Sequence, residues 1–230
     1  MREYILAIRA IWDTWGTGAE LAFDGEFYTH TLMTPFFNPG PNPHGNPRIF
    51  LAAVGPLMTQ AAGEVADGVI CHGFSTERYV REVTLPALEK GAAKAGRGLD
   101  DFEIVAPSFV VARDDEGERA EGTQFVRQQI GFYGSTPAYR PVLELHGWEE
   151  LGDELNAMTK EGKWDQLADV VDDEVLNTFA VVGSAEEALA EMQRRYGDLA
   201  TRVTLTMPAE RDEARWRALF DSVRAQRTAA

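Results

Sequence analysis

Cysteine is almost absent from this 230-residue chain, which contains only Cys71. A single cysteine excludes a disulfide within the chain and a metal site built from several cysteines. Basic residues are also scarce, because 22 lysines and arginines stand against 37 aspartates and glutamates, a formal net charge of −15. Nucleic acids and anionic membranes attract basic surfaces, so we expect neither as a partner.

Long apolar runs are missing as well. No stretch of the sequence is long enough to cross a membrane, and the N-terminus is an amphipathic pattern interrupted by Arg9 and Asp13 rather than a signal peptide. Hydrophobic residues nevertheless make up 44% of the chain, which is enough for a sizeable core. We therefore expect a soluble protein with a cytoplasmic location.

The stretch from Pro47 to Pro56 is the most informative part of the sequence. An apolar run ends there in two alanines and a Gly-Pro, a helical pattern follows at 57–64, and a second apolar run begins at 66–71. This order predicts a strand, a tight turn, a helix and another strand. Gly55 can adopt backbone angles that other residues avoid, and Pro56 suits the first position of a helix.

A helix that begins at this turn would present free amides to a ligand. The backbone N–H groups of Gly55, Leu57 and Met58 would point out of its N-terminus, and such an end binds phosphate or another anion. A Gly-Pro turn also occurs in α/β units for packing alone, so the motif by itself leaves both interpretations open.

Four strands are expected in all, and a helix follows each of them. The strands lie near 48–54, 68–72, 102–112 and 201–207, and helices are expected at 2–15, 57–64, 76–95 with a bend at Pro86, 114–133, 184–196 and 210–226. This order indicates a parallel sheet with right-handed crossovers. The last strand alternates apolar and polar residues, which fits a barrel strand with Thr204 and Thr206 facing an inner polar pocket.

Two long segments interrupt this pattern, one from Gly16 to Asn46 and one from Gly134 to Asn177. The first is expected to contain a short hairpin near 21–28. Long segments of this kind inside compact domains are usually functional or disordered, and these two are too aromatic for disorder. We expect both to flank the mouth of the pocket, with apolar walls supplied by Phe36, Phe37, Phe132 and Tyr133. Because the first segment precedes the strand near 48–54, the opposite face of the barrel stays open as its alternative position.

Several polar and aromatic residues have both a structural and a functional interpretation. His72 closes a strand, so it either faces a pocket and touches substrate or is only hydrogen-bonded at the strand end. Asp67 is expected to be a turn residue, and the acidic clusters at 114–118 and 172–174 to be helix starts or solvated faces. The four histidines show no ligand spacing with acids, so we expect no metal. Structural roles are expected for His146, Tyr133, Tyr139 and Trp148.

A series of motifs along the chain together resembles a known family. They are Gly25-Glu26-Phe27-Tyr28, Thr34-Pro35-Phe36-Phe37-Asn38-Pro39, Ile49-Phe50-Leu51-Ala52-Ala53-Val54-Gly55-Pro56, Ala62-Gly63-Glu64-Val65-Ala66-Asp67-Gly68-Val69, Leu85-Pro86-Ala87-Leu88, Phe132-Tyr133-Gly134-Ser135-Thr136, Leu145-His146-Gly147-Trp148 and Val181-Val182-Gly183-Ser184. In this order the chain resembles the luciferase-like monooxygenase superfamily, specifically its coenzyme F-420-dependent oxidoreductase branch.

The resemblance implies a TIM-barrel-like (β/α)8 fold with a flavin-like cofactor at the carboxyl ends of the strands. The residues that it assigns to cofactor binding, on the phosphate side, are Ala52, Ala53, Val54, Gly55, Pro56, Leu57 and Met58. The residues that we assign to the substrate pocket are His72, Phe74 and Thr206.

The four expected strands correspond to the fifth to eighth strands of the family barrel. The resemblance therefore implies a single luciferase-like domain over residues 1–230 that consists of the C-terminal half of the barrel with two insertions and lacks its N-terminal part. The catalytic residues, which this sequence does not identify, are expected in the missing segment. A half barrel has free strand edges, so we expect a homodimer or pairing with the missing barrel half.

The expected function is that of an oxidoreductase transferring hydride between coenzyme F-420, a deazaflavin, and an unknown small organic substrate. Two alternatives stay open. One is an FMN-dependent luciferase-like monooxygenase acting with molecular oxygen, and the other is a non-catalytic half-barrel that binds a partner chain or a cofactor.

Overall fold

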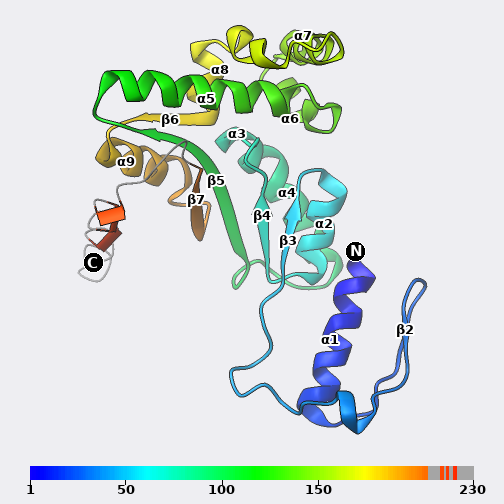
Figure 1. The fold of residues 1–230 in the computed structure, drawn as a ribbon. Helices are drawn as coiled ribbons and strands as arrows, with labels where there is room; N and C mark the ends of the chain where they lie inside the picture. Colours follow the sequence, from blue (N-terminus) through cyan, green and yellow to red (C-terminus); the bar gives the residue numbers. More distant parts are fainter. Residues whose placement is uncertain (207–212, 215, 218–219, 222–230) are drawn as a thin grey trace. The chain divides into compact units, whose positions relative to one another are not determined.

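The computed structural model describes residues 1–206, 213–214, 216–217 and 220–221, and it divides the chain into two compact units (Figure 1). Unit 1 is formed by Met1–Cys71 and Arg81–Val105, and unit 2 by His72–Val80 together with the described part of 106–230. Each unit is described by itself below. The expectation of a single domain over the whole chain stays a prediction.

Unit 1 contains the expected strand-turn-helix-strand segment. Its elements are α1 (Arg2–Thr17), β1 (Phe23–Asp24), β2 (Thr29–His30), the 3-10 helix η1 (Pro35–Phe37), β3 (Phe50–Ala53), α2 (Pro56–Val65), β4 (Gly68–Cys71), α4 (Leu85–Lys94) and the first residues of β5 (Glu103–Ala112). Strands β3 and β4 pair in parallel, and β4 pairs in parallel with the start of β5. The parallel order predicted from the sequence is therefore confirmed.

The two faces of this sheet differ in exposure. Leu51, Ala53 and Val69 are buried on the face that carries α2 and α4 (Figure 1). On the other face Ala52 and Ile70, which are partners in the β3–β4 register, are both exposed. A parallel sheet usually has both faces covered, so this apolar face lacks a cover within unit 1.

Helices α2 and α4 approach each other closely through two glycines. A Cβ atom on Gly63 would collide with the backbone carbonyl of Leu88, and one on Gly91 would collide with the backbone carbonyl of Gln60. Both glycines are buried in the helix contact. Their lack of a side chain therefore sets the distance between the helices that cover the sheet.

We expect Gly63→Ala to lower the free energy of unfolding by about 1–3 kcal/mol, because the added methyl group overpacks the α2–α4 contact. Chemical denaturation measures this change. The matched control is Gly16→Ala at the end of α1, where a Cβ meets nothing within 4 Å, and this change is expected to stabilise by up to about 1 kcal/mol. Equal effects of the two substitutions would contradict the close helix approach.

The predicted hairpin is present, and a carboxylate from α1 holds its turn. The side chain of Glu3 accepts hydrogen bonds from the backbone N–H groups of Phe27 and Tyr28, both at 2.6 Å, and from that of Glu26 at 3.1 Å. Burial opposes the charged form, but these three hydrogen bonds outweigh it and lower the pKa of Glu3 below 4.5. The turn is thus an anion site that the chain fills with its own side chain.

We expect Glu3→Gln to speed hydrogen exchange at the amides of Phe27 and Tyr28 severalfold, because a neutral amide is a weaker acceptor than a carboxylate. The pKa of Glu3 is lower in the folded than in the unfolded chain. In the unmodified chain the protection of these two amides is therefore complete above pH 4.5. It is lost as the pH falls through the lowered pKa of Glu3 in the folded chain. Glu20→Gln, at an exposed position, is the control. Unchanged exchange in Glu3→Gln would show that the hairpin does not depend on this carboxylate.

The segment at 16–46 is anchored at the edge of the sheet where the strands begin. Arg9 of α1 donates to the carbonyl of Val65 at 3.1 Å and to Asp67 at 2.8 Å, and Asp67 also accepts from the backbone N–H of Ile49 at 2.7 Å. These contacts confirm the structural role expected for Asp67. They also attach α1, and the hairpin held by Glu3, at the end of β3 opposite its carboxyl end (Figure 1). Of the two positions expected for this segment, these contacts favour the one opposite the Ala52–Pro56 turn.

The helix expected over 76–95 is interrupted, as Pro86 predicted. It consists of α3 (Glu77–Tyr79), a π-helical segment η2 (Val80–Thr84) and α4, with Pro86 in the first turn of α4. Proline has no N–H and its ring clashes with the carbonyl four residues earlier, here that of Glu82. The wider π turn relieves this clash.

Unit 2 combines the later strands with most of the helices. Its elements after α3 are the rest of β5, α5 (Glu116–Gly134), the 3-10 helix η3 (Pro137–Tyr139), α6 (Arg140–Leu145), α7 (Glu149–Lys160), the 3-10 helix η4 (Trp164–Val170), α8 (Asp173–Phe179), β6 (Ala180–Gly183), α9 (Ala185–Tyr196) and β7 (Arg202–Thr206). Strand β6 pairs in parallel with β5, from Phe109 opposite Ala180 to Ala112 opposite Gly183, and β7 also pairs with β5.

The acidic clusters begin helices, as expected. Asp115 accepts from the backbone N–H of Glu118, and Asp172 accepts from that of Val175. Ser184 and Glu187 form the predicted capping box at the start of α9. The sequence did not predict β6, because a four-residue apolar run directly after a helix has no turn signal before it.

The alternation predicted for the last strand is confirmed. Val203 and Leu205 pack against a buried cluster that includes Val110, Val181 and Met192, whereas Thr204 and Thr206 are exposed. The helix expected over 210–226 lies largely outside the described residues, and its described positions, 213–214, 216–217 and 220–221, are helical.

Candidate functional site

The N-terminus of α2 is an uncapped helix end at the carboxyl end of β3. Gly55 is the N-cap residue and makes no side-chain cap, and Pro56 occupies the first helical turn. Among the described residues, no acceptor binds the backbone N–H of Leu57 or Met58, and the first amide with a partner is that of Thr59, which donates to the Gly55 carbonyl at 3.1 Å. The side chain of Leu57 is 81% exposed. The positive end of the helix dipole is therefore open to a ligand.

Gly55 is not required by the backbone of this turn. Its φ of −85° and ψ of 159° are extended angles that any residue adopts, so the expectation that it supplies unusual angles is wrong. A Cβ atom at this position would meet nothing within 4 Å. Within unit 1, a side chain there would occupy only the space in front of the helix end. Neither the backbone angles of this turn nor the packing around it therefore requires a glycine at position 55.

His72 directly follows β4 in the chain and is held by aromatic residues of unit 2. Its Nδ1 atom accepts a hydrogen bond from the backbone N–H of Phe74 at 3.0 Å. The ring of Tyr139 stacks on the imidazole with centroids 4.5 Å apart, and its hydroxyl oxygen lies 3.1 Å from Nε2. Tyr133 meets the imidazole edge-on at 4.9 Å. His72 is therefore a half-buried, oriented side chain, and both interpretations offered by the sequence are compatible with it.

Burial controls the ionisation of this group. It lowers the pKa of His72, and no charged neighbour contributes to the shift. The neutral imidazole is thus favoured at neutral pH. Burial also raises the pKa of the neighbouring Cys71 thiol to about 12, which keeps it protonated and unreactive.

The other two residues assigned to the substrate pocket have different surroundings. Phe74 is fully buried and stacks on Phe179 at 4.4 Å, so it has no surface for a substrate to contact, and its assignment as a lining residue is corrected to a core role. Thr206 is exposed at the end of β7. Its role in a pocket stays a prediction.

Tyr139 is a residue beside His72 that the sequence did not identify, because only packing within the second insertion was expected for it. Tyr133 was expected either to pack there or to supply an apolar wall of the pocket. Their contacts with His72 join residues 67 and 61 positions apart in the chain. The aromatic spacing in Phe132-Tyr133-Gly134-Ser135-Thr136-Pro137-Ala138-Tyr139 was the available signal. His146 has the structural role expected for it, since its Nε2 lies 2.8 Å from the Thr76 hydroxyl and its ring stacks on Trp148.

We expect Phe74→Ala to lower the free energy of unfolding by about 3–5 kcal/mol, because it empties a fully buried position next to Phe179. Thermal or chemical denaturation measures the loss. Phe125→Ala, which removes a half-exposed ring from α5, is the control and is expected to change stability by about 0.5 kcal/mol at most. A loss of stability below about 1 kcal/mol in Phe74→Ala would contradict the core role and favour the original assignment of Phe74 to the pocket lining.

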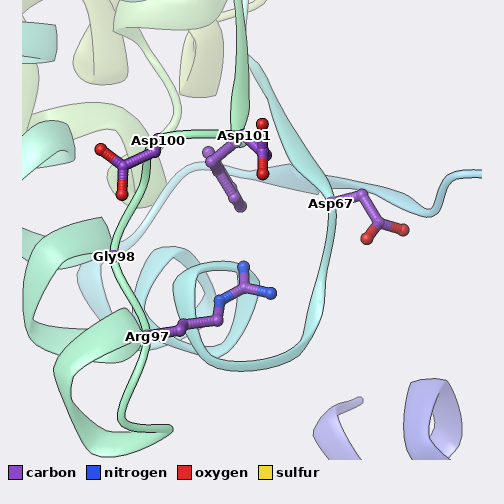
Figure 2. A pocket seen from close by; sticks show the side chains of 6 residues that line it. Asp67, Arg97, Gly98, Asp100 and Asp101 are labelled. Carbon is purple, nitrogen blue, oxygen red and sulfur yellow. The ribbon is translucent and has the colours of Figure 1, made fainter.

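A polar cavity of unit 1 lies at the opposite edge of the sheet and is not a site candidate. Figure 2 shows the Arg97 side chain beside it, with Asp67, Asp100 and Asp101 at its rim, and its volume is about 270 Å³. Arg97 is already engaged, because it donates to the carbonyls of Gly63 and Ala66 at the carboxyl end of α2. Burial lowers the pKa of Arg97, and Asp67 opposes the shift. This arrangement stabilises a helix end, and the cavity is smaller than ordinary ligand pockets.

The described part of the chain offers neither a cluster of metal ligands nor a membrane-spanning helix. No group of three or more histidine, cysteine, aspartate or glutamate side chains there is placed to hold a metal ion. No helix in that part is long and apolar enough to cross a membrane.

Known proteins match this chain over most of its length. The family model described as luciferase-like monooxygenase matches residues 1–202. An uncharacterised protein of Mycobacterium tuberculosis (strain ATCC 25618 / H37Rv) is 46% identical over 203 residues, which are 88% of this chain and 60% of the relative. The 5,10-methylenetetrahydromethanopterin reductase of Archaeoglobus fulgidus is 28% identical over 218 residues, 93% of this chain and 61% of the relative.

The fold is shared with a solved structure. That of the coenzyme F420-dependent tetrahydromethanopterin reductase from Methanopyrus kandleri matches with a TM-score of 0.66 at 20% identity, over 89% of this chain and 56% of the other. The chain thus spans little more than half the length of the proteins it matches. The expected fold class, an α/β fold with a parallel sheet of the luciferase-like TIM-barrel type, is confirmed.

Proposed function

Because this chain belongs to the luciferase-like monooxygenase family, we propose that it forms the cofactor- and substrate-binding part of an F-420-dependent oxidoreductase. The family includes oxidoreductases, and a coenzyme F420-dependent reductase shares its fold. When bound, coenzyme F-420 supplies the hydride carrier, and the chain's own residues bind, orient and enclose the reactants.

The open N-terminus of α2 carries this proposal. The amides of Gly55, Leu57 and Met58 suit a phosphate group, because a helix N-terminus combines unpaired N–H donors with a favourable dipole. The absence of a side chain at Gly55 leaves room in front of these amides, and no neighbour requires a glycine there. The Ala52–Pro56 turn precedes the helix, and its small residues allow a bulky group to come close to the backbone.

His72 is the proposed contact for a small organic substrate. It has a defined orientation and lies among the rings of Tyr133 and Tyr139, which offer apolar surface beside one polar group. Binding sites for small molecules typically combine these two features. The identity of the substrate is not part of the proposal.

The same helix end would accept the phosphate of FMN, so a flavin-dependent monooxygenase is the second candidate. The matching family model is described as luciferase-like monooxygenase, and this description supports the flavin-dependent monooxygenase as the second candidate. Titration with each cofactor separates the two candidates, because only the preferred one binds tightly.

The exposed sheet face supports a third proposal, that of a partner. Ala52 and Ile70 would lie inside a closed barrel. Their exposure, together with the position of β3 at the end of the described sheet, favours a covering set of strands from the remaining barrel half or a second copy of this chain. This cover is also what a non-catalytic half-barrel would need. Turnover of the chain with and without a separately supplied barrel half distinguishes an enzyme part from a binding module.

We expect Gly55→Val to weaken coenzyme F-420 binding at least about tenfold while thermal unfolding stays unchanged, because the added side chain blocks the amides without touching the fold. Quenching of the deazaflavin fluorescence measures the affinity. Gly16→Val, at another position where a Cβ meets nothing, is the control with expected wild-type affinity. Unchanged affinity in folded Gly55→Val, or no binding by the unmodified chain, would refute the proposed cofactor site.

A further inference from the structure

The segment at 27–47, which leads from the hairpin to β3, combines an uncharged sequence with exposed apolar side chains. It contains no aspartate, glutamate, lysine or arginine, although such residues make up 26% of the chain. Phe36 is 87% exposed, Leu32 77% and Phe37 67%. The rings of Phe36 and Phe37 meet edge to face with centroids 5.0 Å apart. Grouped apolar side chains of this kind on a protein surface mark a place that another molecule covers.

The backbone of this segment is ordered by its own residues. It contains five prolines, and the 3-10 helix η1 begins at one of them. The side chain of Asn38 accepts from the backbone N–H of Gly40 at 2.9 Å, and that of Asn42 accepts from the backbone N–H of His44 at 3.0 Å. A surface that is ordered in advance loses little conformational entropy when it binds, which suits an interface.

Closure of the barrel does not account for the exposure of these side chains. Strands that complete the barrel would pair along β3 and cover Ala52 and Ile70. The segment at 27–47 instead runs beyond the end of β3 at which the strand begins (Figure 1). Phe36 and Phe37 therefore belong to a surface separate from the sheet face.

The charge of the chain indicates what this surface meets. Two copies, each with a formal net charge of −15, repel each other wherever acidic residues come together. The exposed ring of Phe125 illustrates this, because Glu121 and Asp165 line the same groove. The segment at 27–47 has no such carboxylates, and homodimer interfaces are likewise depleted of charge at their core. A strongly basic or acidic partner would find no opposite charge on it, whereas a second copy finds an uncharged surface that matches its own.

The exposed area is of the size that a dimer uses. The two phenyl rings together expose roughly 230–380 Å², if one ring buries about 150–250 Å² when fully covered. A standard interface takes about 800 Å² from each partner, a little over half of it apolar. Phe36 and Phe37, together with Leu32, thus supply most of the apolar area that one side of a stable dimer requires.

We propose that the segment at 27–47 is a self-association surface, on which Leu32, Phe36 and Phe37 meet the same residues of a second copy across a two-fold axis. Such an isologous contact uses one patch twice and closes at two copies. The proposal concerns a surface other than the sheet face and the cofactor site, and it does not depend on the proposed function.

Sedimentation velocity of the full chain over a series of concentrations measures the association. We expect the unmodified chain to be a dimer and Phe36→Asp to weaken dimerisation at least about tenfold, because the two-fold axis brings the new carboxylate against its own copy. Phe125→Asp, at another exposed ring, is the control and is expected to dimerise like the unmodified chain. Both positions are on the surface, so circular dichroism is expected to show the same fold in all three proteins.

Chemical crosslinking identifies the surface that is in contact. Cys71 is buried, so a bismaleimide reacts with a cysteine introduced on the surface. Leu32→Cys is expected to give a crosslinked dimer, and adding Phe36→Asp to it is expected to abolish the crosslink. Phe125→Cys is expected to stay uncrosslinked under the same conditions.

Three results would overturn the proposal. The first is a chain that stays monomeric at every concentration, including one that binds vesicles of phosphatidylcholine as a monomer. The second is association that Phe36→Asp leaves unchanged, which would place the contact at the sheet face with Ala52 and Ile70. The third is equal weakening by Phe36→Asp and Phe125→Asp.

Discussion

The parallel pairing of β3 with β4 is the constraint on which the rest of the site depends. Ala53 and Cys71 are partners in the register, so both strands end at the same edge of the sheet. The chain then turns from β3 directly into α2, which places the N-terminus of that helix at this edge. Close contact between α2 and α4 through Gly63 and Gly91 holds the helix against the strands. The direction in which the free amides point is thus a consequence of strand pairing and glycine packing.

The two edges of this sheet are used differently. At the edge where the strands begin, charged groups are satisfied within unit 1: Asp67 binds Arg9 and the Ile49 amide, and Arg97 binds the end of α2. At the edge where they end, the amides of Leu57 and Met58 have no partner within the described part of the chain, and small residues line the turn. In barrels of this class the carboxyl ends of the strands carry the active site, while the other edge contributes stability. The distribution of satisfied and unsatisfied polar groups in this chain follows that division.

Much of the fold was predictable because local signals agreed with it. The apolar run before Gly55, the proline at the start of α2 and the capping box at Ser184 each specify an element without reference to distant residues. Strand β6 was missed because four apolar residues after a helix carry no such signal. The anchoring of the segment at 16–46 was also missed, since it depends on Glu3 and Arg9, which contact residues more than twenty positions away.

The candidate site was predictable in part for the same reason. The Ala52–Met58 turn is contiguous, so the sequence alone could indicate it, although the φ of Gly55 shows that the turn does not need glycine for its backbone angles. The surroundings of His72 were not predictable. Tyr139 reaches it from 67 positions away, and the hydrogen bond from the Phe74 amide to its Nδ1 depends on the folded backbone. Burial likewise separated His72, which is half-buried, from Phe74, which belongs to the core.

A map of backbone amide shifts during titration of the chain with coenzyme F-420 tests the cofactor site at the α2 N-terminus most directly. If the α2 N-terminus binds the phosphate, the largest saturable shifts occur at the amides of Gly55, Leu57 and Met58, and a cofactor stripped of its phosphate no longer produces them. Saturable binding that leaves the resonances of these three amides unshifted would contradict a phosphate site at the N-terminus of α2.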